Sequence, residues 1–361
     1  MSIADESKTS GNFSEVKTSQ TKTSSPEEYS VFGHYHRPLT ETLKADHFNF
    51  EPVIRCLEES GGKVVYRPLD LISEVSTDSN RNAENEIAAY DGFGIKHLNQ
   101  EQNAVCLEEH LYGRKIVNAA LMGLPAFSPI TCTDEEFDVA RARVCILAHR
   151  VDSISSTWYQ AFTYKQPDEN NAPPDLPADW SELATEIPFL GIARGKFWEK
   201  VHIDVRNSFV AATRVLKSKG LEIHAADHVI SDLTQQAASL IKNKKHSSEI
   251  LASLTSLSHK YRETLSHYKD FIILLPAFPT PRAALSKHSA NSTNRELGLY
   301  ELIIPSLLAN LGAMTIPCGF SSSGLPIGLQ LIASKNQVPN ALRLATLYSE
   351  HANWPTVNSE N

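Results

Sequence analysis

The sequence has no long apolar run and no paired cysteines. A membrane helix needs about 20 apolar residues, whereas the most apolar stretch, Phe271–Leu275, has the length of one strand. The N-terminus has no apolar segment behind basic residues, which predicts that a secretory signal is absent. The five cysteines are odd in number and lie too far apart for a C-x-x-C pair or a disulfide ladder. We therefore expect reduced cysteines and a cytoplasmic location.

Basic residues are also too few to form a stripe. Lys and Arg number 34 against 42 Asp and Glu, and the net charge of −8 argues against nucleic acid or an anionic membrane surface as a partner. The hydrophobic fraction of 41% is ordinary for a soluble globular protein with a packed core. At 361 residues, the chain can form one large domain or two modest ones.

Common catalytic and ligand-binding motifs are missing as well. The sequence contains no G-x-S-x-G elbow, no Walker loop, no H-E-x-x-H and no complete G-x-G-x-x-G. His34 and His36 form a His-x-His pair, but no third ligand lies nearby, so we interpret them as a surface pair. We predict no metal site and no cofactor.

Composition divides the chain into a tail and one domain. Residues 1–29 consist mainly of Ser, Thr, Lys and Glu, which predicts disorder, and the domain is expected to span residues 30–355. Within it, residues 81–110 are rich in Asn and Gln and are predicted to be mostly loop. Residues 166–179 are rich in Pro, Asp and Asn and are predicted to be an internal linker.

A helix, a glycine stop and a strand follow one another twice. Apolar residues at helical spacing within Phe50–Leu57 precede the apolar strand Val64–Tyr66. The same order returns in the helix Val205–Leu216 and the strand-like Leu221–Ile223. This alternation predicts an α/β fold.

The last third of the chain shows the clearest elements. Ile272–Leu275 is predicted to be a fully buried strand, and a helix further on must be kinked or split by Pro305. Met314–Ile316 indicates a short strand, and Ile327–Leu331 alternates as a strand with one apolar face. A final helix is predicted to open at Pro339.

Three segments of this last third carry a family resemblance: Tyr268–Pro276, Asn310–Phe320 and the G-L-P-I-G-L-Q-L-I run Gly324–Ile332. They resemble the C-terminal part of amidase signature enzymes, which include bacterial amidases, the A subunit of glutamyl-tRNA amidotransferase and allophanate hydrolase. Shorter upstream segments resemble the same family: Glu59–Leu71, Tyr112–Arg114, Gly123–Ala126 and Phe189–Ala193. The resemblance implies a mixed sheet flanked by helices.

The resemblance also implies catalytic residues that we do not find. Family members use a lysine, a bridging serine and a nucleophilic serine, with glycine-rich backbone amides holding the oxyanion. The Gly-Gly-Ser-Ser-Gly-Gly type loop should fall between Leu71 and Tyr112, yet residues 81–110 contain no serine. Lys44 is nearest to the expected lysine, but its surroundings do not match, so we interpret it as exposed. We therefore predict a truncated, amidase-like α/β domain in which residues 81–110 replace the catalytic core.

Two other serine-rich segments imitate a catalytic site. Gly319–Gly324 has the Gly/Ser composition of a nucleophile loop, but it lies where the family has a late hairpin turn. Asp152–Thr157 follows His149, so Ser, His and Asp are close in sequence. Triad members meet by folding and not by adjacency, and we assign no catalytic residue to either segment.

The leading hypothesis is an amidase-like pseudoenzyme, isoform or remnant with a binding or scaffold role. One alternative is an active C–N hydrolase of small amides with a non-standard serine and base, and another is a subunit completed in trans. Loss of the core should leave the strands at Val64–Tyr66 and Ile272–Leu275 with unpaired edges, which favours self-association or a protein partner.

Overall fold

The computed structural model describes residues 28–33, 50–68, 105–110, 114–130, 143–163, 180–242, 248–281 and 301–352. Residues 1–27 of the predicted tail, the pair His34 and His36, Lys44 and the predicted linker 166–179 lie outside these ranges.

The described strands form one mixed sheet of ten strands in the order β2-β1-β3-β5-β4-β9-β10-β8-β6-β7. Both parallel pairs, such as β1 with β2, and antiparallel pairs, such as β9 with β10, occur in it. The bounds are β1 Glu28–Gly33, β2 Lys63–Pro68, β3 Val105–His110, β4 Ala126–Ser128, β5 Arg143–Leu147, β6 Leu190–Ala193, β7 His224–Ala226, β8 Ile272–Pro276, β9 Gly312–Phe320 and β10 Pro326–Ala333.

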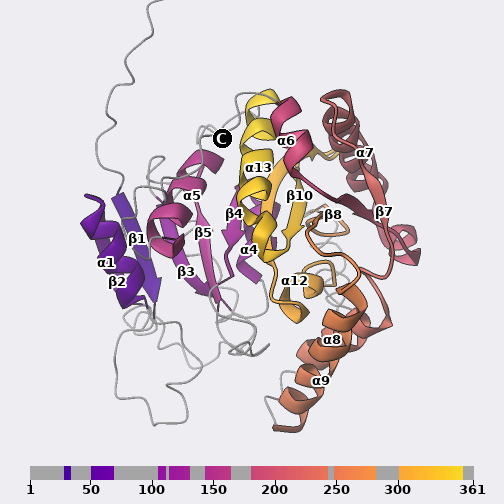
Figure 1. Ribbon diagram of the computed structural model, residues 1–361, viewed down its shortest axis with the longest axis horizontal. Helices are drawn as coiled ribbons and strands as arrows, with labels where there is room; N and C mark the ends of the chain where they lie inside the picture. Colours follow the sequence, from indigo (N-terminus) through magenta and orange to yellow (C-terminus); the bar gives the residue numbers. More distant parts are fainter. Residues whose placement is uncertain are drawn as a thin grey trace, which may run out of the picture.

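Helices cover both faces of the sheet. The α-helices are α1 Glu51–Glu59, α4 Arg114–Leu121, α5 Val151–Trp158, α6 Trp180–Glu186, α7 Ile203–Ser218, α8 Asp232–Lys242, α9 Ser248–Leu265, α12 Ile304–Leu308 and α13 Val338–Ala352. Shorter helical turns are η2 Tyr159–Thr163, η3 Lys196–Lys200 and η5 Lys335–Gln337. One buried cluster unites α1, α5, α6, most of α7 and α13 with one face, and α4, α8, α9 and α12 pack on the other (Figure 1).

This architecture confirms the predicted fold class, and the family-like segments of the last third form adjacent strands β8, β9 and β10. The first helix–glycine–strand unit is α1 followed by β2. In the second unit α7 ends as predicted, but the strand is His224–Ala226 and not Leu221–Ile223. The apolar side chain of Leu221 packs with α7 instead, in the buried cluster that also holds Leu216.

Part of the predicted loop 81–110 is a strand. Val105–His110 forms β3, which pairs with β1 on one side and β5 on the other. Val105, Cys106 and Leu107 are fully buried, and this short apolar run outweighs the polar composition around it. The predicted tail likewise extends too far, because Glu28 and Tyr29 belong to β1 and Tyr29 is buried.

The expectation of two unpaired edges is correct for one strand and wrong for the other. Strand β8 is paired on both sides, with β10 and with β6, and all its residues are buried. Among the described strands, β2 does stand at the end of the sheet order. Pro305 does not kink a helix either, since it lies in the first turn of α12, where a missing N–H costs little.

Helix α4 is seated very close to the sheet. A Cβ atom at Gly328 in β10 would lie 2.8 Å from the Cβ of Ala120 in α4 and 3.0 Å from the Cβ of Ala277. Only glycine permits this approach without a shift of the helix. The contact fixes α4 over β10, next to the inward-facing position of Gln330. No helix within the described ranges is long and apolar enough to cross a membrane.

Candidate functional site

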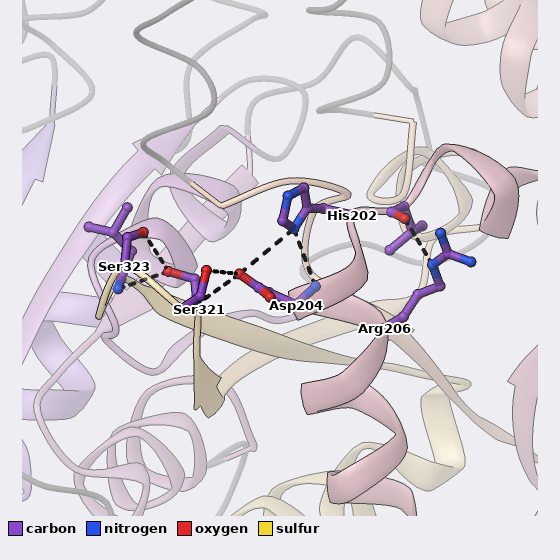
Figure 2. A network of polar contacts seen from close by, with 8 residues as sticks. His202, Asp204, Arg206, Ser321 and Ser323 are labelled. Atoms are coloured by element: carbon purple, nitrogen blue, oxygen red, sulfur yellow. Dashed lines mark hydrogen bonds and ion pairs between the residues drawn. The ribbon is translucent and has the colours of Figure 1, made fainter.

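The Gly319–Gly324 segment comprises the end of β9 and most of the turn that leads to β10. The Ser321 N–H donates to the Leu325 carbonyl at 2.8 Å, and Gly324 has a φ of 77°, which glycine adopts readily. Both the N–H and the hydroxyl of Ser322 donate to Asp204 Oδ2, each at 2.9 Å. Figure 2 shows the hairpin turn, marked by Ser321 and Ser323, beside Asp204 and His202 at the start of α7.

The order of contacts in this network differs from that of a serine triad. A triad places histidine between serine and aspartate, so that the imidazole can take the serine proton. Here the Ser322 hydroxyl donates directly to the carboxylate, and His202 Nδ1 accepts from the Asp204 backbone N–H at 3.2 Å. His202 therefore caps α7, and Asp204 attaches the helix to the hairpin. The backbone hydrogen bond from Ser322, then its hydroxyl, lowers the pKa of Asp204.

The Asp152–Thr157 segment lies in α5, where most of its polar groups have structural partners. Asp152 accepts from the Ser153 N–H at 2.9 Å and pairs with Arg150. The Thr157 hydroxyl donates to the Ser153 carbonyl at 2.7 Å. Ser155 is buried, and its hydroxyl has no hydrogen-bond partner among the described residues.

His149 does not join Ser155 in a described pocket. It lines a hollow of about 310 Å³ that also includes Arg150 and Asp152 from the start of α5, together with Ser349 and Glu350 of α13. Ser155 is not among the lining residues of this hollow. The structure therefore does not assemble the serine, histidine and aspartate of this segment into one site.

A third candidate site, which the sequence did not reveal, lies on a buried face of the sheet. Residues in register cross five strands in the row Leu147, Ala126, Thr315, Gln330 and Leu275. Thr315 and Gln330 are the polar members of this row, and both are fully buried on the face that α4 and α12 cover. The alternation in β10 suggested one apolar face, whereas both faces of this strand are covered.

Two buried oxygens of this row, and a third on the residue that precedes Leu302, have no hydrogen-bond partner among the described residues. They are Thr315 Oγ1, Gln330 Oε1 and Glu301 Oε1, and Glu301 is only 7% exposed. The amide nitrogen of Gln330 donates to the Leu302 carbonyl at 3.4 Å, which ties the residue next to Glu301 to β10. We call Glu301, Thr315 and Gln330 the acceptor cluster.

Helix α12, which follows Glu301, is fixed at its other end. Arg143 donates from its two terminal nitrogens to the carbonyls of Ser306 and Leu307, at 3.4 and 3.1 Å. The Ser258 hydroxyl donates to the Leu308 carbonyl at 2.7 Å. These bonds satisfy carbonyls that a helix end leaves without partners. The residues of the acceptor cluster therefore lie on β9, on β10 and just before α12, whose end is held in place by hydrogen bonds.

The described cysteines are Cys56, Cys106, Cys145 and Cys318, and no disulfide joins any two of them. Burial raises the pKa of Cys318 to about 12, which keeps it protonated at neutral pH. Across the described ranges, no group of three or more His, Cys, Asp or Glu side chains is placed to hold a metal ion.

Comparison with known proteins matches part of the chain to one family. Residues 228–338 match the family model described as Amidase. The A subunit of glutamyl-tRNA(Gln) amidotransferase from Synechococcus sp. (strain RCC307) is 40% identical over 84 residues, which are 22% of this chain. The match spans only 16% of the length of that relative.

Solved structures share the fold of most of the chain. The A subunit of glutamyl-tRNA(Gln) amidotransferase from Thermotoga maritima superposes with a TM-score of 0.60 at 14% identity, covering 93% of this chain and 86% of that one. The 6-aminohexanoate cyclic dimer hydrolase does so with a TM-score of 0.52 at 14% identity, covering 71% of this chain and 67% of that one. The chain has the fold of these amidases, and its residues 228–338 carry the sequence match to the Amidase family model.

The first prediction concerns the stability of the acceptor cluster. Replacing Thr315 with Val removes a buried hydroxyl without a described partner, so the free energy of unfolding should stay equal or rise by up to about 1 kcal/mol. The matched control is Thr234→Val, because Thr234 is equally buried but its hydroxyl donates to the Ser231 carbonyl at 2.7 Å. The control should lose about 0.5–2 kcal/mol. Urea denaturation measures both, and a larger loss in Thr315→Val than in the control would contradict the assignment.

The second prediction concerns the pH dependence of the Asp204 contact. Because the folded pKa of Asp204 is lowered, its contribution to stability is complete above the unfolded pKa of about 3.9. The contribution is lost as the pH falls through the lower folded pKa. Asp204→Asn should therefore be less stable than the wild type at pH 7, with a difference that shrinks in acid.

Urea denaturation at several pH values measures this difference. The exposed carboxylate of Asp227 provides the control variant, Asp227→Asn. A stability gap between the wild type and Asp204→Asn that stays constant from pH 7 to pH 3 would rule out the proposed linkage.

Proposed function

We propose that this amidase-family chain acts by binding and not by amide hydrolysis. The observation that carries the proposal is the hydrogen bond from the Ser322 hydroxyl to Asp204, which attaches α7 to the β9–β10 hairpin. Ser322 lies in the segment whose sequence is most similar to a nucleophile loop. A nucleophilic serine needs a base that removes its proton, and here the hydroxyl meets a carboxylate that is already the acceptor for a backbone N–H. The absence of a Gly-Gly-Ser-Ser-Gly type loop from the sequence supports the same view.

Two other activities compete with this proposal. An active hydrolase of small amides would need a serine and a base from unfamiliar positions, and Ser155, with its unpartnered buried hydroxyl, is the described residue that favours it. A chain completed in trans would receive its catalytic groups from another protein. The relative from Synechococcus is named as a subunit of an amidotransferase, which lends this second alternative support by analogy.

We further propose that the chain self-associates or binds a protein partner through β2. The outer side of this strand has no neighbour among the described strands, and an open edge invites pairing with another chain. Val64 and Val65 are half-buried in the middle of the strand. No disulfide joins any two of the described cysteines, which is compatible with a reducing, cytoplasmic compartment.

The third prediction is that the purified chain does not hydrolyse simple aliphatic amides. Without a positioned nucleophile and oxyanion hole, the several kcal/mol of barrier reduction that each supplies are missing. Ammonia release should equal that of the Ser155→Ala/Ser322→Ala double variant, and a fluorophosphonate probe should label neither serine. Turnover that follows the protein through purification would refute the proposal, and the labelled serine would identify the site that carries it.

The fourth prediction concerns the oligomeric state. Sedimentation at increasing concentration should show self-association of the wild-type chain, and Val65→Lys should weaken it because a charge on an edge strand opposes pairing. The control is Val210→Lys, which adds the same charge at an exposed valine of α7. Circular dichroism checks that both variants fold. A monodisperse wild-type monomer would contradict the proposed role of β2.

A further inference from the structure

We propose that the acceptor cluster of Glu301, Thr315 and Gln330 binds the primary ammonium group of a small-molecule ligand. The inference deepens the proposed binding role and rests on it. It assigns a site inside the sheet to a defined class of ligand, namely amines that are protonated at neutral pH.

The strand register and one hydrogen bond support one shared site. Thr315 and Gln330 are direct partners in the antiparallel register of β9 and β10, which places their Cα atoms about 4.5–5.5 Å apart. Gln330 in turn bonds the carbonyl of Leu302, the residue that follows Glu301. Helix α4, which packs against Gly328, and helix α12, which Arg143 holds in place, cover the same face of the sheet.

The unpartnered atoms determine what kind of group fits. Each residue offers an oxygen acceptor: a carboxylate oxygen in Glu301, an amide oxygen in Gln330 and a hydroxyl oxygen in Thr315. Buried acceptors without donors are costly, so a donor-rich group is favoured at this place. A primary ammonium group has three N–H donors and no acceptor, which matches three acceptors. Its positive charge also compensates the buried carboxylate.

Other occupants match the cluster less well. A neutral primary amide has two N–H donors but carries no charge to compensate the Glu301 carboxylate. A quaternary ammonium group has the charge but no N–H. Calcium prefers six to eight oxygen ligands, more than the cluster supplies. A bound water carries no charge to compensate Glu301.

The test is saturation-transfer NMR on the full chain with methylammonium chloride, compared with tetramethylammonium chloride at equal ionic strength. Both probes carry one positive charge and methyl protons, but only methylammonium has N–H donors. We expect saturation transfer to methylammonium alone. Glu301→Gln should weaken its Kd by at least about tenfold, the loss expected when a hydrogen bond to a charged group is removed.

Variants separate the site from general effects. Thr315→Val should weaken the Kd severalfold, and it serves as the second test if Glu301→Gln fails to fold. Thr346→Val is the control, because its hydroxyl bonds the Leu342 carbonyl within α13 on the other face of the sheet. The control should leave the Kd unchanged.

Three results would overturn the inference: no saturation transfer to methylammonium, equal transfer to both probes, or an unchanged Kd in folded Glu301→Gln and Thr315→Val. None of these results bears on amide hydrolysis, which the ammonia-release assay measures separately. Failure of the ammonium site and failure of the non-catalytic proposal are therefore distinguishable.

Discussion

The antiparallel pairing of β9 with β10 is the interaction on which the rest of the structure depends. Its register joins eight residue pairs, and a shift occurs only near the hairpin turn, between Ile327 and Gly328. On one side β9 continues the sheet to β4, and on the other side β10 continues it to β8. Because both faces of this pair are covered by helices, a slip of one residue would exchange the two sets of buried side chains. The register therefore positions both helical layers together.

The C-terminal part of the fold could be predicted because its signals are local. Ile272–Leu275 is an uninterrupted apolar run, and Gly324–Pro326 is a recognisable turn, so the strands and the hairpin follow from neighbouring residues. Strand β3 could not be recognised in the same way. Its buried run is only Val105, Cys106 and Leu107 before two glutamates, and its pairing partners come from distant segments. Such a strand is stabilised by its place in the sheet more than by its own sequence.

The acceptor cluster was missed for a related reason. Thr315 and Gln330 are ordinary residues for a half-exposed strand, and nothing in their spacing shows that α4 and α12 cover them. Their chemistry depends on burial and on which donors are within reach, and both depend on the tertiary arrangement. The serine-rich segments show the opposite case, in which the composition suggests a catalytic site that the structure does not form. Ser322, Asp204 and His202 do come together, yet the order of their contacts makes a structural joint between a helix and a hairpin.

Because α4 packs so closely on β10, the side-chain volumes at Gly328 and Ala120 are coupled, although the two residues are distant in sequence. With Gly328 and Ala120 in contact, a methyl group added on the strand requires an equal space to be vacated on the helix, or a displacement of the whole helix. Displacement would also change how α4 covers Gln330. The size of the residue at position 328 thus determines how closely α4 covers the buried polar residues of β10, although Gly328 itself carries no polar side chain.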